Sequence, residues 1–173
     1  MRTNFQSAIV ITAALAGCCA LAGNGDTISY PAGFRQWVHI KSTIVGAQHS
    51  FFNKEPCTKP CVGGIFHFYA NAKALEGYRT GTFPDGAMIV DEFLELREVP
   101  NQPNASIEGQ KRGTGMMLKD SRRYEATGGW RFDTFKGDSH TDGRLSEKEA
   151  AAQCAACHQS RKDHDYVFSS YKE

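Results

Sequence analysis

Alternating apolar and polar positions recur along the chain and predict a sheet of short strands. The clearest case is residues 64–70 (GIFHFYA), where Phe66 and Phe68 fall on one face and Ile65, His67 and Tyr69 on the other. Four further segments are predicted as strands: 37–45, 87–96, 116–119 and 130–135. Because these segments are short and separated by turn signals, they predict a mainly antiparallel sheet.

Helical signals are few and short. Residues 71–78 predict a helix that ends at Gly81, and residues 147–154 predict a second one that begins with a capping box of Ser146 and Glu149. Pro84-Asp85-Gly86 predicts a turn, and loops are expected at 100–104 and 137–143. The pattern therefore predicts an α+β fold, mainly antiparallel β-sheet with a few short helices, without internal repeats.

The first 22 residues predict an export signal. Arg2 precedes ten apolar residues, 8–17, which are too few to span a bilayer as a mature helix. Two cleavage sites compete, because the LAGC segment that ends at Cys18 resembles a bacterial lipobox, whereas ALA at 20–22 would release a soluble protein. We expect a signal peptide at 1–22, with lipobox cleavage before Cys18 as the alternative, and one domain at 23–173. This predicts a periplasmic protein that contacts a membrane only through a possible N-terminal lipid anchor.

The overall composition is that of an ordinary globular domain, with 40% hydrophobic and 23% charged residues among 173. A formal net charge of +1 lacks the basic excess of nucleic-acid-binding proteins, so no nucleic-acid partner is expected. Six cysteines are the unusual feature. Cys18 and Cys19 belong to the export signal, which leaves four in the predicted domain.

The strongest motif is Cys154-Ala155-Ala156-Cys157-His158, the pattern of c-type haem attachment. Two thiols three residues apart on one helical turn can each add to a porphyrin vinyl group, and the histidine that follows can ligate the iron. A redox-active Cys-x-x-Cys site and half of a zinc site are the alternatives. We predict one covalently attached haem c, held by Cys154 and Cys157, with His158 as axial ligand.

Cys57 and Cys61 form a different pair, with three residues between them and no histidine after them. Pro56 and Pro60 place the pair in a loop. In an oxidising compartment a local disulfide is the expected state, with free thiols or a metal site as alternatives. Such a bridge closes a short loop and stabilises a protein only modestly.

Other residue types that serve haems are present, each with a structural alternative. Methionines that can ligate iron, or else fill the core, are Met88, Met116 and Met117. For His39 and His67 a structural role is favoured over iron ligation. Aromatic residues that can wall off a haem from water are Trp37, Phe66, Phe68, Phe93 and Trp130. Arginines that can pair with haem propionates, or else lie at the surface, are Arg122, Arg123 and Arg131.

With the haem motif placed near its C-terminus, the chain resembles the cytochrome P-460 and cytochrome c′-beta family. The matching segments, in order, are YPAGFRQW at 30–37, GTFPDG at 81–86, KDSRRY at 119–124, GGW at 128–130, CAACH and DYVF at 165–168. Each piece is short, and the specific signal is their order together with the haem motif. The resemblance implies a homodimer of β-rich subunits, each with one c-type haem and an open distal position.

Two branches of that family differ at one position. In the P-460 branch a lysine cross-links to the porphyrin rim and the protein oxidises hydroxylamine. Counted without gaps from FPDG at 83–86, that lysine position is Asp91 here. A carboxylate cannot form the amine link, so no such cross-link is expected. Asp91 becomes a candidate residue of the distal pocket, with a surface carboxylate as the alternative.

The resemblance implies a periplasmic mono-haem cytochrome whose five-coordinate haem binds small gaseous ligands such as nitric oxide, or is redox-active toward them. Two alternatives stay open. One is a P-460-like oxidoreductase of hydroxylamine or nitric oxide, which would be an enzyme. The other is a plain electron-transfer cytochrome with methionine as the sixth iron ligand and a redox partner protein.

Overall fold

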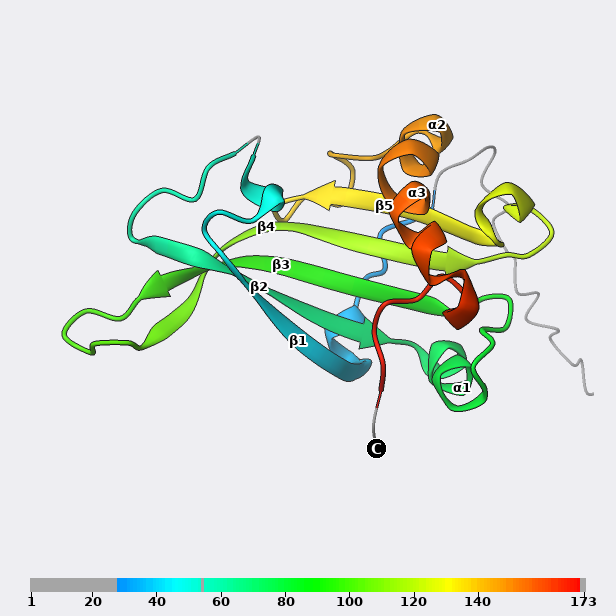
Figure 1. Ribbon diagram of the computed structural model, residues 1–173, viewed down its shortest axis with the longest axis horizontal. Helices are drawn as coiled ribbons and strands as arrows, with labels where there is room; N and C mark the ends of the chain where they lie inside the picture. The colour runs from blue at the N-terminus through cyan, green and yellow to red at the C-terminus, as the bar shows by residue number, and fades with distance from the viewer. Residues whose placement is uncertain (1–27, 54, 172–173) are drawn as a thin grey trace, which may run out of the picture.

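The five strands of the sheet stand in the order in which they occur in the chain, and every neighbouring pair is antiparallel. The computed structural model describes residues 28–53 and 55–171 (Figure 1). Its strands are β1 (Val38–Gly46), β2 (Cys61–Ala70), β3 (Met88–Glu98), β4 (Ser106–Lys119) and β5 (Trp130–Lys136). With the short helices given below, they confirm the predicted α+β fold. The expected signal peptide at 1–22, with Cys18, lies outside the described residues.

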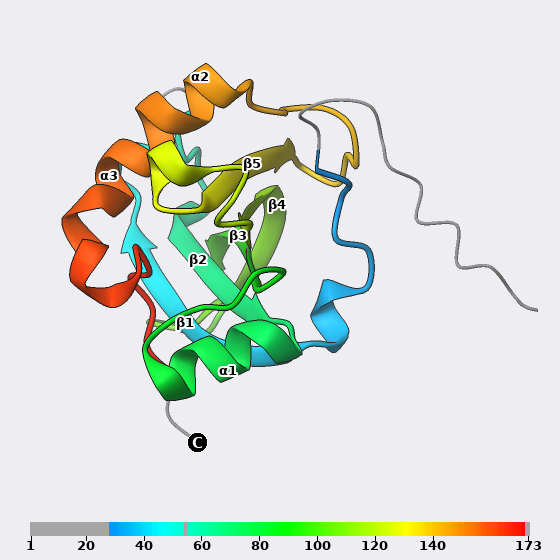
Figure 2. The ribbon, with the colours of Figure 1, turned by 90° about the vertical axis from the view of Figure 1, so that its right-hand side faces the viewer.

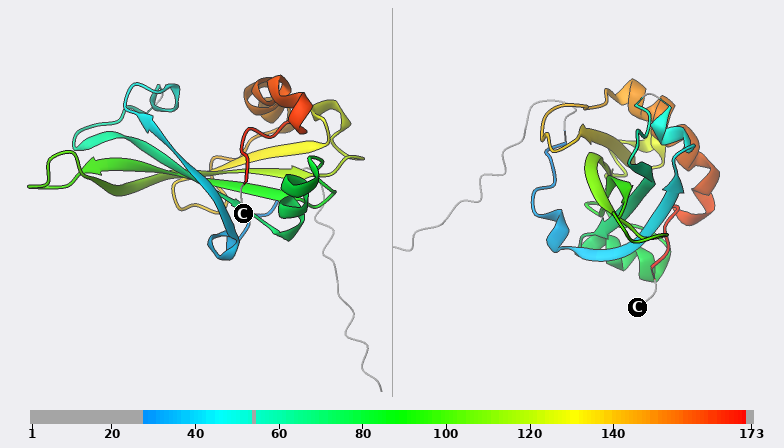
Figure 3. Two further views of the ribbon diagram at one scale, coloured as in Figure 1. Left: turned by 60° about the horizontal axis from the view of Figure 1, so that its bottom comes forward. Right: turned by 90° about the vertical axis from the view of Figure 1, so that its left-hand side faces the viewer.

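Strand β4 begins at Ser106, whereas the pattern predicted a strand only from residue 116. The added part is polar and rich in glycine, a composition that disfavours strands. Glycine is needed there because neighbouring atoms come close. A Cβ atom on Gly113 would lie 2.7 Å from the Phe135 carbonyl oxygen, and one on Gly115 would lie 2.4 Å from Asp91 Oδ1. The start of β4 extends with the end of β3 as a hairpin past the helices (Figure 3).

The two faces of the sheet are covered by different parts of the chain (Figure 2). The face beneath the C-terminal helices, which we call the helix face, presents the side chains of Phe66, Phe68, Ile89, Asp91, Phe93, Met117, Trp130 and Phe132. The opposite face, which we call the N-terminal face, packs against Ile28 and Phe34 through Val90, Met116 and Phe135. Alternation along each strand thus separates two sets of buried side chains.

Helix α1 (Ala72–Thr80) follows β2 directly and has both of its ends capped. The Asn71 side chain accepts a hydrogen bond from the Ala74 backbone N–H at 2.9 Å, and Gly81 ends the helix in the left-handed conformation, φ 82°. The predicted turn at Pro84 is present, since the Ala87 N–H donates to the Pro84 carbonyl at 2.9 Å.

The C-terminal helical segment runs from Glu147 to His164 as four consecutive pieces. Helix α2 (Glu147–Ala150) starts with the predicted capping box, in which Ser146 and Glu149 bond each other's backbone N–H. A wider π-helical turn (Ala151–Ala155), helix α3 (Ala156–His158) and a 3-10 turn (Gln159–His164) follow. The predicted helix at 147–154 therefore continues for a further ten residues, as far as His164. Among residues 28–53 and 55–171, no helix is long and apolar enough to cross a membrane.

Candidate haem site

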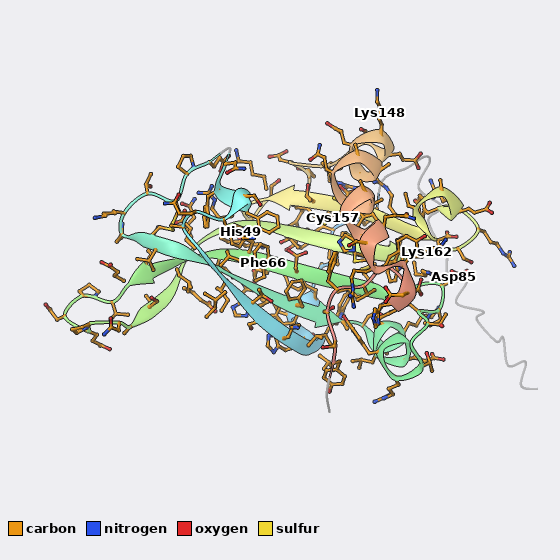
Figure 4. All side chains as sticks on the ribbon, in the orientation of Figure 1. His49, Phe66, Asp85, Lys148, Cys157 and Lys162 are labelled. Carbon is orange, nitrogen blue, oxygen red and sulfur yellow. A yellow bond between two sulfur atoms is a disulfide. The ribbon has the colours of Figure 1, made fainter. Side chains whose placement is uncertain are left out.

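The two cysteines of the CAACH motif are free thiols at the junction of the π-helical turn and α3. Cys154 is half-buried and packs against the core of the helix face, whereas Cys157 is exposed. Figure 4 shows Cys157 on the helical segment, while Phe66 lies on the sheet. Burial, and to a smaller extent the charge of Asp91, raises the pKa of the Cys154 thiol. Both sulfur atoms are thus unbonded and placed where two thioether links to one porphyrin would begin.

His158 is held in one orientation by three contacts. Its Nδ1 lies 2.6 Å from the Tyr166 carbonyl oxygen, and its ring centroid lies 4.8 Å from that of Phe132 and 5.0 Å from that of Phe168. Because a carbonyl oxygen can only accept, this hydrogen bond places the imidazole proton on Nδ1. Burial lowers the pKa of His158, which favours the neutral ring. A neutral ring with its proton on Nδ1 leaves the Nε2 lone pair free to bind iron.

An aromatic wall stands on the helix face beside this segment. The rings of Phe66 and Phe93 stack with centroids 4.2 Å apart, and Phe51 lies 4.8 Å from Phe66. Phe52 completes the cluster from the connection between β1 and β2. Sequence reasoning missed Phe51 and Phe52, although an adjacent aromatic pair after a predicted strand was a usable signal.

Trp37 does not belong to this wall, contrary to the prediction. Strand β1 begins only at Val38, and Trp37 in the preceding connection packs with Tyr30 and Phe34 on the N-terminal face. Trp130 does lie on the helix face, fully buried. A tryptophan just outside a strand does not follow the strand's alternation, which is why its face could not be predicted.

Asp91 lies on the helix face between Phe68 on β2 and Gly115 on β4. The Gly115 backbone N–H donates a hydrogen bond to its carboxylate, and burial raises the pKa of Asp91 to about 6. The residue as a whole is half-buried. A carboxyl group that changes charge near neutral pH therefore lies on the same face as Cys154 and His158.

The raised pKa of Asp91 predicts how stability depends on pH. The folded state holds the Asp91 proton up to about pH 6, whereas the unfolded chain releases it at the ordinary carboxyl pKa of 3.8. Stability should therefore fall as pH rises through this window, by on the order of 3 kcal/mol. Asp91→Asn should remove this loss, so the free energy of unfolding of the variant should increase relative to that of the wild type as pH rises. Urea unfolding across the window tests this, with the exposed Asp163→Asn as control; parallel Asp91→Asn and wild-type curves would contradict it.

The remaining iron-ligand candidates lie elsewhere. Met88 and Met116 pack on the N-terminal face, across the sheet from His158, whereas Met117 is buried on the helix face. His67 lies on the N-terminal face as well. There its Nδ1 is 2.8 Å from Ser42 Oγ and its Nε2 is 2.7 Å from Glu108 Oε1.

His39 joins the same hydrogen-bond network, with its Nε2 3.0 Å from Ser42 Oγ. Both histidines thus have the structural role that was favoured. The arginines proposed for propionates differ in exposure. Arg131 is buried and donates to the Leu145 carbonyl at 2.7 Å, whereas Arg122 and Arg123 are exposed.

Cys57 and Cys61 are joined by a disulfide, with their Cα atoms 5.5 Å apart. Cys61 is buried against Phe66 and Phe93. The bridge therefore borders the aromatic wall and holds the connection that supplies Phe51 and Phe52.

The residues present fit a covalently bound haem. Two free thiols and a neutral imidazole with an available Nε2 are the donor set that c-type attachment requires. Two aromatic side chains in this region remain exposed. Phe168, whose ring lies against His158, is 50% exposed, and Phe51 in the aromatic wall is 58% exposed. Apolar surface of this kind is what a porphyrin would cover.

Comparison with known proteins gave a match to a family of cytochromes. The family model described as cytochrome P460 matches residues 31–169, a range that includes the aromatic wall, Asp91 and the CAACH motif. A search of curated proteins gave no match. Because the family model covers most of the chain, the chain belongs to the cytochrome P460 family and is a haem cytochrome of the c type.

Proposed function

We propose that this cytochrome carries one covalent haem c with a five-coordinate iron and binds a small gaseous ligand such as nitric oxide. The observation that supports this most directly is that His158 is available as an iron ligand, whereas on the helix face the one described residue of the other usual ligand types, Met117, is buried in the core. On the described strands the helix face presents phenylalanines, the carboxyl of Asp91 and the core-packed Met117, but no histidine or free cysteine.

In this proposal the chain's own residues have separate roles. Cys154 and Cys157 tether the haem, and His158 ligates the iron through Nε2. When bound, the haem would supply a ferrous iron that can bind a small gas. The aromatic wall excludes water from that side, which favours small uncharged ligands over hydrated ones.

Asp91 supports a second candidate, an oxidoreductase acting on hydroxylamine or nitric oxide. Oxidation of hydroxylamine needs a group that accepts protons from the substrate, and a carboxyl with a pKa of about 6 can do so near neutral pH. An electron-transfer role is less well supported, because Met88 and Met116 lie across the sheet from His158 and Met117, although on the helix face, is packed in its core. The proposal includes export to the periplasm and a homodimer, which rest on the N-terminal sequence and on the family resemblance.

The test is the absorption spectrum of the haem-loaded protein in its ferric, ferrous, carbonyl and nitrosyl forms. We expect a high-spin, five-coordinate ferrous form that converts fully to a nitrosyl species when nitric oxide is added. Met117→Leu should leave all four spectra unchanged, because Met117 is packed in the core rather than bound to iron. A low-spin, six-coordinate ferrous spectrum in the wild type would contradict the proposal.

Turnover separates the two candidates. Steady oxidation of hydroxylamine by the wild type, lost in Asp91→Asn while the nitrosyl spectrum persists, would favour the oxidoreductase. Mass spectrometry of haem peptides adds a second measurement. Attachment at Cys154 and Cys157 alone would show that no further cross-link is made.

A further inference from the structure

The carbonyl that holds His158 comes from an unusual backbone turn. Asp165 and Tyr166 both have positive φ, 49° and 65°, which is uncommon for residues other than glycine. Two such residues in succession cost free energy and persist only where the surroundings hold them. This left-handed turn is what directs the Tyr166 carbonyl toward Nδ1 of His158 at 2.6 Å.

The Asp165 side chain holds the turn at the end of the sheet. Its Oδ1 lies 2.5 Å from Lys119 Nζ at the end of β4, and its Oδ2 accepts a hydrogen bond from the Phe83 backbone N–H at 2.8 Å. Both members of the ion pair are largely buried, with side-chain exposure of 9% for Lys119 and 14% for Asp165. Removing one partner of such a buried ion pair strongly destabilises a protein, because the other charge is left buried without a partner.

Three further contacts surround the same turn. The Trp130 indole N–H donates to the Asp165 carbonyl at 2.8 Å, and the Tyr166 N–H donates to the Arg161 carbonyl at 2.8 Å. The Tyr166 ring lies against Gly128, where a Cβ atom would come within 2.1 Å of it. Lys119 also donates to the Gly128 carbonyl at 2.9 Å, so one ammonium group binds both the Asp165 carboxylate and the glycine against which the Tyr166 ring packs.

We propose that Asp165 is a positioning residue for His158. Through its ion pair with Lys119 it keeps the Tyr166 carbonyl on Nδ1 and so sets how strongly the imidazole donates to the haem iron. This inference rests on the proposed function, in which His158 ligates the iron. A strong Nδ1–H···O bond makes the imidazole a better donor, and partners of this kind tune the metal they do not touch. A better donor stabilises ferric over ferrous iron and lowers the reduction potential.

The test uses the haem-loaded protein and two readouts besides ligand binding, the reduction potential and the iron–histidine stretching frequency of the ferrous form. Asp165→Asn keeps the size of the side chain and an acceptor for Phe83 but loses the charge that attracts Lys119. We expect its equilibrium constant for reduction to rise about three- to tenfold, where tenfold is 59 mV for one electron. The iron–histidine frequency should fall. Lys119→Met should likewise raise the reduction potential and lower the iron–histidine frequency. Lys119→Arg keeps the positive charge, so both readouts should stay near the wild-type values.

Two control variants separate a positioning role of Asp165 from a general loss of structure. Asp163→Asn removes a carboxylate two residues away that is 69% exposed and pairs with His164, so neither readout should move. Asp165→Gly permits positive φ at no cost but has no carboxylate, and it should shift as far as Asp165→Asn or further.

The inference fails if Asp165→Asn and Lys119→Met both load haem and leave the potential and the frequency unchanged. An unshifted Asp165→Gly would also overturn it, since the carboxylate would then have no role. If His158→Ala left the spectrum of the wild type intact, His158 would not be the ligand. That outcome would overturn the proposed iron ligation together with this inference, and is thereby distinguishable from a failure at Asp165 alone.

Discussion

Replacing Cys154 and Cys157 together by alanine is expected to abolish covalent haem attachment completely. Each thiol can form one thioether bond, and among the described residues the structure contains no other free cysteine. Single replacements should leave one thioether and therefore a reduced yield of haem-bearing protein. Haem staining after denaturing electrophoresis, together with intact-protein mass, measures the loss. Covalent haem in the double variant would show an attachment that does not use these thiols.

The matched control is the other cysteine pair. Cys57→Ala with Cys61→Ala removes the disulfide but neither tether, so covalent haem should persist. The bridge closes a loop of only a few residues, for which the expected stabilisation is small. Stability should decrease modestly, most of it from the cavity left at the buried Cys61.

Trp130→Ala is expected to give the largest loss of stability of any single substitution described here, about 3–5 kcal/mol. The side chain is 0% exposed, its ring centroid lies 5.5 Å from that of Phe83, and Lys119 Nζ lies 5.0 Å from its centroid. Its indole N–H also satisfies the Asp165 carbonyl, which would be left without that donor. Urea unfolding measures the loss.

Two variants divide this effect into its parts. Trp130→Phe keeps most of the buried ring but removes the N–H donor, so it should cost about 1–3 kcal/mol. Trp37→Ala, at the half-buried second tryptophan on the N-terminal face, should cost clearly less than Trp130→Ala. Equal losses for the two alanine variants would mean that Trp130 is not at the centre of the core that supports His158.

Much of the fold could be predicted because its signals are local. Alternation correctly placed Phe66 and Phe68 on one face and His67 on the other, and the capping box correctly located the start of α2. The first ten residues of β4 escaped prediction for a physical reason. Gly113 and Gly115 weaken any strand signal, yet they are needed where the Phe135 carbonyl and the Asp91 carboxylate come close. A single sequence does not show which glycines make room for a neighbour.

In the candidate haem site as well, the local features could be predicted and the long-range ones could not. The haem motif is five consecutive residues, so its spacing alone indicated both the tethers and the ligand. The turn at Asp165 and Tyr166 depends on Lys119, Trp130 and Phe83, which lie 35 to 82 residues away in the chain. Nothing within the tail itself indicates positive φ at two ordinary residues, and no local signal could have identified the orienting carbonyl.

The two cysteine pairs also bear on how the protein is assembled. The cysteines of each pair are only a few residues apart, so in the unfolded chain they meet each other more often than they meet cysteines of the other pair, because a short loop costs less entropy to close. An oxidant strong enough to join Cys57 to Cys61 can join Cys154 to Cys157 by the same chemistry. That second bridge would consume both tethers before the cofactor arrives. Under such an oxidant, covalent haem attachment would require Cys154 and Cys157 to be returned to thiols while Cys57 and Cys61 stay joined. The two pairs differ in access to a reductant, because Cys61 is buried and Cys157 is exposed.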